Sequence, residues 1–436
     1  MSLLAATDVG CGWKSGGGIG AALRTRFDTV IFLYTLSALT ILQGIVSLIE
    51  GIRSARYMRC YGTNHPGASP EASPYRARAS RAAPRWLPGR VGVFCPCKGV
   101  DHEFEKNIRS ILGQDFPAFA VYFILESAED PAYSVLRNIG APNVLIAGEA
   151  TDCGQKVHNL RYAVQSVGCN VDTYVFCDSD ARYPRNWLAK ITEPLHDGLT
   201  GVCTGYRWYT VRRFHIPTLL RSAWNSTALG VLGDHDRNFA WGGSIAIRRE
   251  TFERIAVLDA WSGALSDDYA ITRATQKAGL HVRFVPACLI PSYGECSFSE
   301  LLEFTTRQII ITRVYHPRLW AIGFVAQTVF SLAFWGLLVA NLWTGTPVLF
   351  LLWITIFTLS ATRSAVRLSA VKATIPEPSS LRFVWFYVLS SPVVALLYQF
   401  NMTCAALTTD IKWRQIHYKL ISPNQTLVRR SSAKAG

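Results

Sequence analysis

Long apolar runs near both ends of the chain constrain its fold more than any other feature. Residues 27–49 contain one charged side chain, Asp28, and are long enough to cross a bilayer, which needs about 20 residues. Two further runs, 319–343 and 347–361, are separated by the short neutral segment W-T-G-T-P. The sequence therefore predicts an integral membrane protein with one anchor before its middle domain and two spans after it.

A third apolar run, at 383–407, is interrupted by Ser390, Ser391 and Pro392. Basic residues flank this run on both sides. A single crossing would put one of these basic flanks outside the cytoplasm, against the positive-inside rule. Each half is short for a full span. We expect a re-entrant or interfacial hairpin, with one ordinary crossing as the alternative.

The distribution of basic residues predicts the orientation and the partners. Lys and Arg number 44 against 30 Asp and Glu, a net charge of +14, and arginines crowd the segment after the first apolar run. The positive-inside rule places that segment, and the middle domain, in the cytoplasm. An anionic membrane surface explains this charge without nucleic acid, which we do not expect as a partner. The Arg- and Ala-rich linker favours a bacterial inner membrane over the Golgi or endoplasmic reticulum.

The cysteines and the composition exclude several classes of protein. Half of the residues are hydrophobic, which is too many for a disordered chain. The 11 cysteines are scattered and form no C-x-x-C pair, so neither a disulfide scaffold nor a zinc ribbon is expected. We divide the chain into an N-terminal tail and anchor (1–50), a basic Pro/Arg-rich linker (51–90), a cytoplasmic middle domain (91–300), an interfacial amphipathic segment (301–318), transmembrane or re-entrant segments (319–409) and a basic cytoplasmic tail (410–436).

The middle domain alternates between two hydrophobic periods. Short β-type runs occupy 91–95, 120–125, 143–146 and 173–177, and helical patterns occupy 103–112, 131–139 and 157–167. Such alternation predicts βαβ units and a parallel sheet covered on both faces. Ligands bind beyond the carboxyl ends of the strands in sheets of this kind, so the polar residues that follow each strand are candidates for the site.

Two acidic pairs are candidates for the site, one after a strand and one before a helical run. Asp178 and Asp180 follow the apolar strand TYVFC, and two carboxylates so placed can share a Mg²⁺ or Mn²⁺ ion with a diphosphate. A solvated turn is the alternative. Asp267 and Asp268 precede a helical run at 269–278, where helix capping explains them as well as catalysis does.

Two further features point to phosphate. Lys156 lies at the start of a helix just after a glycine, where backbone N–H groups favour anions. Gly242 and Gly243 precede a strand, and paired glycines let a substrate approach the backbone. An ordinary tight turn explains the glycines equally well.

Taken in order, these motifs resemble a known family. C-P-C-K-G-V-D at 95–101, F-C-D-S-D at 176–180, S-D-D-Y at 266–269 and I-K-W-R-Q-I-H-Y at 411–418 are similar to segments of the inverting glycosyltransferases of the ceramide glucosyltransferase type. These are GT-A enzymes of the family 2/21 kind, with bacterial relatives that act on hopanoids and other lipids. The resemblance covers residues 95–315 and continues more weakly to the tail.

The resemblance implies a fold, an activity and a set of site residues. The fold is an α/β GT-A (Rossmann-like) nucleotide-sugar domain inserted between transmembrane helices. The activity is transfer of a hexose such as glucose from a UDP-sugar to the hydroxyl of a membrane lipid, ceramide-like or other, as in glycolipid and sphingolipid metabolism. Asp268 would be the general base, and Asp178 and Asp180 would hold the Mn²⁺ or Mg²⁺ cofactor. The residues expected to bind the donor are Pro96, Lys98, Asp130, Lys156, Asn159, Asp178, Gly242 and Gly243.

One segment departs from the family pattern. The family ends its catalytic domain with (Q/R)-x-x-R-W, whereas this chain has Ile310 and Ile311 at the Arg and Trp positions. We expect Arg307, Gln308 and Arg313 to lie on the pyrophosphate or acceptor side, with lipid headgroups as the alternative contact for the arginines. The departure argues against a processive polysaccharide synthase. It leaves a catalytically impaired, membrane-bound nucleotide- or lipid-binding relative as the alternative function.

Overall fold

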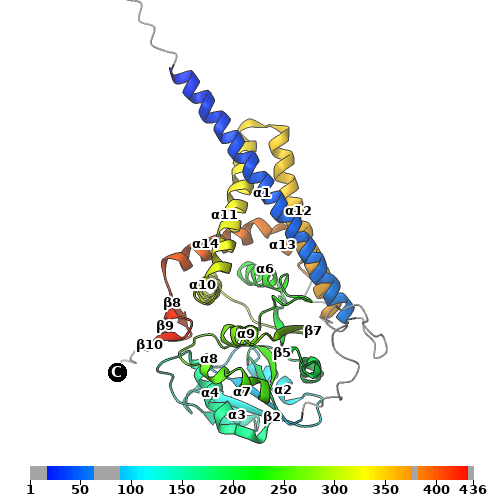
Figure 1. Ribbon diagram of the computed structural model, residues 1–436, viewed down its shortest axis with the longest axis vertical. Coiled ribbons are helices and arrows are strands. Elements are labelled where there is room, and N and C mark those ends of the chain that lie inside the picture. Colours follow the sequence, from blue (N-terminus) through cyan, green and yellow to red (C-terminus); the bar gives the residue numbers. More distant parts are fainter. Residues whose placement is uncertain (1–16, 63–88, 376–381, 431–436) are drawn as a thin grey trace, which may run out of the picture.

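The computed structural model describes residues 17–62, 89–375 and 382–430, with side chains from residue 31 onward. A globular α/β domain lies beneath a bundle of long helices, and shorter helices fill the layer between the two (Figure 1). The two parts are connected through several segments of the chain, so the catalytic domain is held against the bundle from both of its ends.

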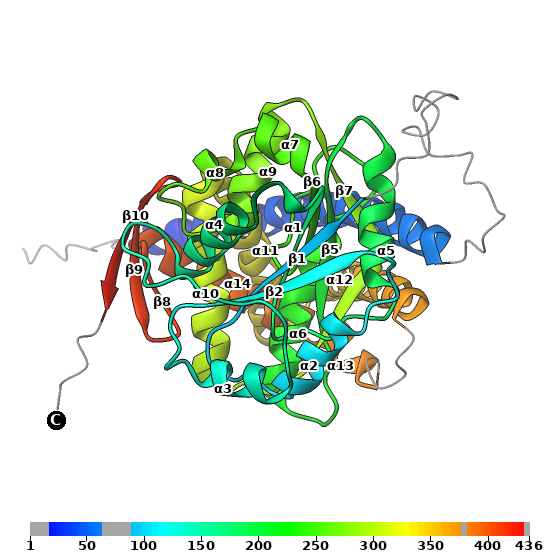
Figure 2. The same ribbon diagram turned by 90° about the horizontal axis from the view of Figure 1, so that it is seen from below.

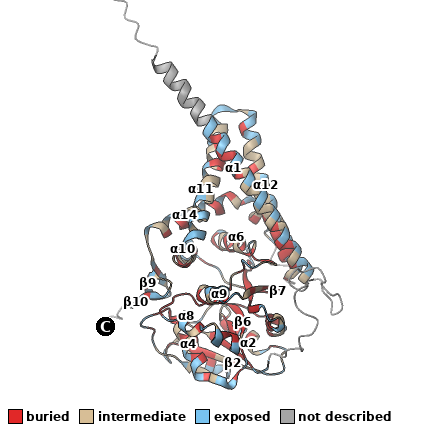
Figure 3. Cartoon of the chain, in the orientation of Figure 1, coloured by how far each residue is buried: buried red, intermediate tan, exposed pale blue. Residues whose placement is uncertain are grey.

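Three helices form the bundle: α1 (Gly17–Gly62), α11 (Pro317–Thr344) and α12 (Pro347–Thr374). Each contains a stretch long and apolar enough to cross a membrane. Leu36, Phe334 and Ile356 pack in a small buried core between the three helices, while their outer faces carry exposed apolar side chains (Figure 3). Apolar side chains that face outward on a helix bundle suit lipid as the surrounding solvent.

The first helix differs from its predicted extent. We expected an anchor that ends at residue 50 and a linker over 51–90, but α1 continues to Gly62. Met58, Ala55 and Ser54 are buried against the catalytic domain, and the Ser54 hydroxyl donates to the carbonyl of Leu232 (2.6 Å). Packing against the domain therefore extends the helix past the membrane segment. The rest of the predicted linker, 63–88, lies outside the described residues.

The third apolar run forms two short helices. Helix α13 (Val384–Leu389) is followed directly by α14 (Ser391–Leu407), and Ser390 lies between them. Pro392 occupies the first turn of α14, where a missing N–H costs nothing. The predicted break at 390–392 is thus confirmed. Helix α14 lies across the lower end of the bundle (Figure 1), and its re-entrant or interfacial nature stays a prediction.

The domain is built on a seven-stranded sheet with the order β3-β2-β1-β4-β6-β5-β7. The strand bounds are β1 (Val91–Pro96), β2 (Phe119–Leu125), β3 (Val144–Ile146), β4 (Thr173–Cys177), β5 (Thr200–Tyr209), β6 (Ser244–Arg248) and β7 (His281–Ser292). The four strands that predicted a parallel sheet, β1 to β4, are parallel to one another. The sheet as a whole is mixed, because β6 runs antiparallel to both β4 and β5. Strand β6 starts at the edge where β4 ends, so it must run back across the sheet.

Helices cover both faces of this sheet. The side chains alternate as a doubly covered sheet requires: Val93 and Val175 face one core, whereas Phe94 and Phe176 face the other. Every residue of β4 and β5 is buried. The covering helices of the domain are α2 (Phe104–Leu112), α3 (Pro131–Asn138), α4 (Gln155–Val167), α5 (Trp187–Thr192), α6 (Ile216–Leu229), α7 (Arg249–Arg254), α8 (Val257–Ala260) and α9 (Asp267–Lys277), with short 3₁₀ turns at Gly168–Asn170 and Glu193–His196.

Helix α10 (Phe298–Tyr315) joins the domain to the bundle. Its start is fixed by a capping box between Ser297 and Glu300. We expected the segment 301–318 to lie at the membrane interface, but Ile309, Ile310 and Ile311 are all buried in the core that the domain shares with α12 and α14. The helix is covered from several sides by protein, which the hydrophobic pattern alone does not reveal.

The predicted basic tail is a folded sheet as far as residue 430. Strands β8 (Asp410–Trp413), β9 (Ile416–Ser422) and β10 (Gln425–Arg430) form an antiparallel sheet at the side of the domain (Figure 2). Alternate residues of β9, including Tyr418 and Leu420, are buried. Residues 431–436 lie outside the described part of the chain.

Candidate active site

The D-S-D turn is held rigidly at the carboxyl end of β4. The backbone N–H of Asp178 donates to the hydroxyl of Tyr183 (2.9 Å), and that hydroxyl donates to the carbonyl of Gly243 (2.7 Å). The hydroxyl of Ser292, at the end of β7, donates to the carbonyl of Asp180 (2.6 Å). Three strand ends therefore fix the direction of the two aspartates.

Gly243 is required at this edge. The pairing of Cys177 with Ser244 brings Gly243 beside Asp178. A Cβ at position 243 would lie 2.6 Å from a carboxylate oxygen of Asp178 and 2.2 Å from the Trp241 ring. The groups that require glycine here are therefore the Trp241 ring and the Asp178 carboxylate. Approach of a substrate to the glycine pair stays a prediction.

Arg207 is a central member of the site that the sequence did not single out. It lies on β5, and its guanidinium donates to Asp178 (2.8 Å) and to both oxygens of Asp180 (2.6 and 2.7 Å). The guanidinium also lies 5.2 Å from the centre of the Trp241 ring. An arginine in the otherwise apolar strand TGVCTGYRWY was the available signal.

Lys156 connects the two acidic pairs. Its Nζ lies 2.9 Å from Asp178 and 3.2 Å from Asp267, and it donates to the carbonyl of Gly242 (3.1 Å). Although burial opposes the charge, Asp178 and Asp267 raise the pKa of Lys156 above its usual value. Lys156 and Arg207 likewise hold the pKa of Asp178 below its usual value against burial. Lys156 is therefore a permanent cation at the predicted position.

Asp267 and Asp268 have different surroundings although they are neighbours at the start of α9. Asp267 is 5% exposed, and burial raises its pKa to about 7. Asp268 is half-buried. Its carboxylate accepts hydrogen bonds from the N–H of Tyr269 (2.8 Å), from the N–H of Gly242 (3.3 Å) and from the Ser266 hydroxyl. Asp268 is therefore the accessible, oriented carboxylate of the pair.

Helix α10 holds the loop that carries these two aspartates. The hydroxyl of Tyr315 accepts from the N–H groups of Leu265 (3.0 Å) and Ser266 (3.2 Å). The hydroxyls of Tyr269 and Thr312 lie 2.7 Å apart. Because α10 leads directly into the span α11, the position of Asp268 is tied to the membrane part of the chain.

The residues after β1 and β2 gather at the same edge of the sheet. Pro96 is the last residue of β1. Lys98 pairs with Glu126 (2.6 Å), and a carboxylate oxygen of Asp130 accepts from the N–H of Gly99 (2.8 Å) while the same residue caps α3. The structure thus places Pro96, Lys98 and Asp130 together, as predicted. Glu126 is an additional member.

The three-stranded antiparallel sheet of residues 410–430, hereafter the C-terminal hairpin, contributes two arginines to this side. Arg430 pairs with Glu126, and Arg414 pairs with Asp101 (2.5 Å). Tyr418 accepts a hydrogen bond from the N–H of Gln155 at the start of α4 (3.3 Å). We expected this segment to be a tail, so its contacts with Glu126, Asp101 and Gln155 were not predicted.

Asn159, which was predicted to bind the donor, has its side-chain amide in the core. The amide donates to the carbonyl of Ile124 (3.3 Å) and accepts from Gln155 (2.8 Å). The residue is 2% exposed. Its contacts support the end of β2 and the start of α4, and the structure does not bring it together with the other site residues.

The three residues of α10 that we expected on the pyrophosphate or acceptor side lie in different surroundings. Arg307 lies with its guanidinium 5.3 Å from the centre of the Trp413 ring, next to the hairpin. Arg313 donates to the carbonyl of Ala405 and lies over Trp320 (5.4 Å). The carbonyl of Gln308 accepts from the hydroxyl of Thr312 (2.8 Å). Arg307 therefore lies on the face of α10 toward the C-terminal strands, whereas Arg313 packs between α10, α11 and α14.

In this arrangement, the carboxylate oxygens of the D-S-D turn are not free to bind a divalent cation. One oxygen of Asp178 pairs with Lys156, the other with Arg207, and both oxygens of Asp180 accept from Arg207. Within the described residues, no group of three or more His, Cys, Asp or Glu side chains could hold a metal. Mn²⁺ or Mg²⁺ needs free carboxylate oxygens and would lie against two cations here. The metal site stays a prediction that requires Arg207 to move away.

Comparison with known protein families identifies the family of this chain. The model of the family described as glycosyl transferase family 21 matches residues 68–426. The chain belongs to glycosyl transferase family 21. This is the ceramide glucosyltransferase-type family that the motifs resemble. Together with the mixed sheet and the three long apolar helices, the family assignment confirms the predicted α/β GT-A fold class between membrane helices.

Several solved structures are similar to parts of the family 21 chain. A mannosyltransferase from Pyrobaculum calidifontis, in complex with GDP-Man and Mn²⁺, is 15% identical with a TM-score of 0.43, over 85% of this chain and 98% of that one. Glucosyl-3-phosphoglycerate synthase from Mycobacterium tuberculosis, in complex with Mn²⁺ and UDP-Glc, is 16% identical with a TM-score of 0.37, over 58% of this chain and 84% of that one.

Proposed function

We propose that this glycosyltransferase moves a hexose, such as glucose, from a UDP-sugar to the hydroxyl of a membrane lipid with inversion at the anomeric carbon. The acceptor is ceramide-like or another hydroxyl-bearing lipid. The observation that carries the proposal is the placement of Asp268: its carboxylate is oriented by three donors, and its loop is bonded to the helix that leads into the span α11. A base so placed serves an acceptor that arrives from the membrane.

The proposed reaction is a single displacement. The acceptor oxygen forms a bond to the anomeric carbon as the bond from that carbon to the diphosphate oxygen breaks. Asp268 takes the proton of the attacking hydroxyl, and the electron pair of the broken bond leaves on UDP. Attack opposite to the leaving group inverts the anomeric centre. The half-buried position of Asp268 suits this role better than the buried position of Asp267.

Cationic side chains near the leaving group support the same reaction. Lys156 and Arg207 lie beside the D-S-D turn, and Lys98, Arg414 and Arg430 lie at the donor side. Arginine binds diphosphate oxygens in pairs, and a fixed cation stabilises the charge that develops on them. We assign donor binding to this group together with Pro96, Asp130, Gly242 and Gly243.

The membrane helices support a lipid acceptor and a defined orientation. Three helices are long and apolar enough to span a bilayer. By the positive-inside rule, the arginine-rich segment that follows the first of them supports a cytoplasmic position for the catalytic domain. A bacterial inner membrane is our proposed location.

The proposal is tested by UDP release from detergent-purified protein with a panel of UDP-sugars and lipid extracts. Asp268→Asn should lower lipid-stimulated release by about 100-fold or more, because the general base is lost, while UDP affinity stays within about twofold since no donor-binding contact is removed. Asp259→Asn, the same change at an exposed position of α8, is the matched control. Loss of UDP binding in Asp268→Asn would show that Asp268 is not the base.

A non-catalytic relative is the second candidate. Ile310 and Ile311 stand where the family has Arg and Trp, and both are buried among apolar side chains, where they cannot contact a diphosphate. UDP binding without release for any donor and lipid would favour this candidate. Lipid-stimulated release that depends on Asp268 would exclude it.

A further inference from the structure

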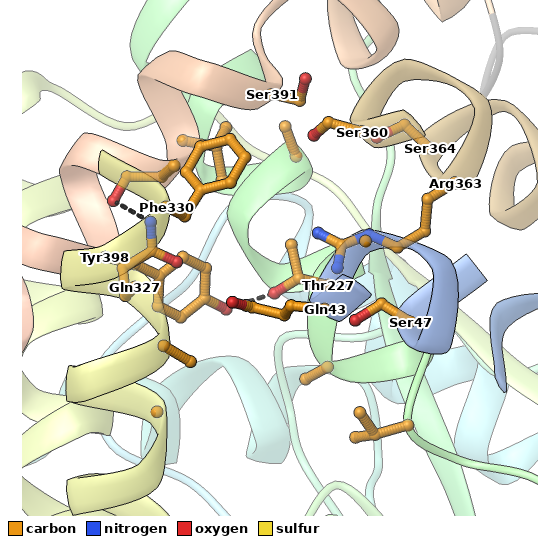
Figure 4. A pocket seen from close by; sticks show the side chains of 18 of the residues that line it. Gln43, Ser47, Thr227, Gln327, Phe330, Ser360, Arg363, Ser364, Ser391 and Tyr398 are labelled. Carbon is orange, nitrogen blue, oxygen red and sulfur yellow. Dashed lines mark hydrogen bonds between the residues drawn. The ribbon is translucent and has the colours of Figure 1, made fainter. Parts of the chain in front are cut away.

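A cavity of about 370 Å³ lies where the three long helices meet the catalytic domain. Its walls come from α1, α6, α10, α11, α12, α13 and α14. The lining combines apolar side chains such as Phe330 and Met402 with polar ones such as Gln43 and Ser47 (Figure 4). A cavity with apolar and polar walls, where the helix bundle meets the domain, suits a molecule that is part polar and part hydrocarbon.

Two arginines of α12 make the cavity chemically unusual. Arg363 and Arg367 are four residues apart, so they lie one above the other on one face of the helix, and both line the cavity. Arg367 is only 9% exposed. The Nε atoms of both are buried without a hydrogen-bond partner. Figure 4 shows the guanidinium of Arg363 pointing into the cavity.

Within the part of the chain that the structure describes, these arginines lack a carboxylate partner. Among the described residues, no Asp or Glu forms an ion pair with either one, and the contact of Arg367 with Ser364 is long, at 3.5 Å. Arginine within a membrane segment is costly and normally faces a partner or a cavity. Two adjacent cations also repel each other, so an anion between them would remove both costs.

We propose that this cavity binds the headgroup of an anionic phospholipid, with its phosphate paired to Arg363 and Arg367. Guanidinium groups match phosphate oxygens in geometry and charge. Gln43, Ser47 and Thr227 supply hydrogen-bonding groups nearby, and the acyl chains would leave along the apolar faces of α1, α11 and α12. Inorganic phosphate carries a similar charge but has no acyl chains to contact the apolar walls. We therefore expect the bound phosphate group to belong to a lipid.

The cavity reaches the element that positions the general base. Thr312 lines it, and the hydroxyl of Thr312 bonds to that of Tyr269, the residue after Asp268. A lipid bound here therefore contacts the helix that holds the loop of Asp268. The inference does not depend on which lipid receives the sugar.

The test uses full-length protein stripped of lipid in neutral detergent, titrated with phosphatidylglycerol, phosphatidylcholine or inorganic phosphate. Bound lipid is counted by native mass spectrometry. We expect one phosphatidylglycerol to be retained in preference to phosphatidylcholine. Arg363→Gln with Arg367→Gln should weaken its binding about tenfold or more, as expected for loss of a charge-assisted contact. Lys372→Gln, an exposed cation on the same helix, should leave it unchanged.

Three outcomes would overturn the inference. The first is equal retention of phosphatidylcholine and phosphatidylglycerol by the wild-type protein, a result that needs no variant to fold. The second is a failure of the variants to differ as expected. Either binding is unchanged in the double variant, or Lys372→Gln loses as much binding as the double variant does, which would show attraction to the general surface charge. The third is an equal effect of inorganic phosphate, which would make the occupant a free anion. UDP affinity of each sample reports separately on the catalytic domain.

Discussion

At the scale of single residues, the site consists of three aspartates whose carboxylates are paired with two cations, Arg207 and Lys156. Arg207 takes both oxygens of Asp180 and one of Asp178, and Lys156 bridges Asp178 to Asp267. Asp178 and Asp180 could be predicted because they follow an apolar strand. A charged residue within β5 was a signal for Arg207, but its place beside Asp178 depends on how the strands pair, which no local pattern specifies.

The pairing of Arg207 predicts how the protein responds to metal. If the guanidinium takes the place of a divalent cation, wild-type UDP affinity measured by calorimetry should be the same in EDTA and in Mn²⁺. Arg207→Gln should weaken UDP binding about tenfold in EDTA, and Mn²⁺ should then restore part of it because Asp178 and Asp180 are free. Arg212→Gln, whose partner is Glu103, is the matched control. A wild-type protein that binds UDP only with Mn²⁺ would support the metal prediction from the sequence instead.

The raised pKa of Asp267 predicts a pH dependence. Burial raises this pKa to about 7, so the carboxyl is neutral below pH 7 and becomes an anion above it. UDP affinity should therefore fall as the pH rises through 7, because a new negative charge appears beside the diphosphate. Asp267→Asn should flatten this step between pH 6 and 8.5, measured by calorimetry. The ionisation of UDP itself is common to both proteins, and an identical step in the variant would contradict the assignment.

At the scale of elements, the C-terminal hairpin closes the donor side of the domain. Its arginines pair with Glu126 and Asp101, and the Thr426 hydroxyl donates to the carbonyl of Gly263 (2.9 Å). Most strands of the main sheet follow from their apolar patterns. The alternation I-H-Y-K-L at 416–420 was also a strand signal, but the basic charge of the segment favoured a tail, and its partner surface comes from distant residues.

Gly263 offers a sharp test of how much the hairpin contributes. Gly263 and Gly279 both have positive φ (+68° and +69°), but an added Cβ at 263 would lie 2.0 Å from the carbonyl oxygen of Asn424, whereas one at 279 meets nothing within 4 Å. Both alanine variants pay about 1 kcal/mol for the left-handed backbone. Gly263→Ala should in addition lower the Tm by several degrees and weaken UDP binding, because the hairpin is displaced. Equal melting temperatures and UDP affinities in the two variants would show that hairpin docking does not matter.

At the scale of the whole molecule, the bundle and the domain are one packed unit. Helix α1 contacts β7 through the bond from Tyr57 to the carbonyl of Phe284 (2.7 Å), and Tyr387 of α13 donates to Ser222 of α6 (2.7 Å). The apolar runs predicted the long helices well, because length and composition suffice for that. The burial of α10 was not predicted, since it results from α14 and the hairpin closing over a segment that is amphipathic by itself.

The proposed topology predicts opposite labelling on the two ends of the bundle. In a protein with Cys11 and Cys60 replaced by Ser, the exposed Cys169 of the catalytic domain should react with a membrane-impermeant maleimide only when the cytoplasmic face of a vesicle is accessible. A cysteine at Thr346, between α11 and α12, should react only from the other face. Detergent-solubilised vesicles give the total for each site. Labelling of both cysteines from one face would rule out this arrangement.

The position of the hairpin also determines the order in which the molecule can be completed during synthesis. Residues 91–292, which carry the whole seven-stranded sheet, leave the ribosome before α11, α12 and α14 are made. Glu126 and Asp101 acquire Arg430 and Arg414 only after those helices exist. The nucleotide site is therefore finished last, once the membrane part has been translated. A chain that stops short of its final strands would carry an intact sheet and an unfinished donor site.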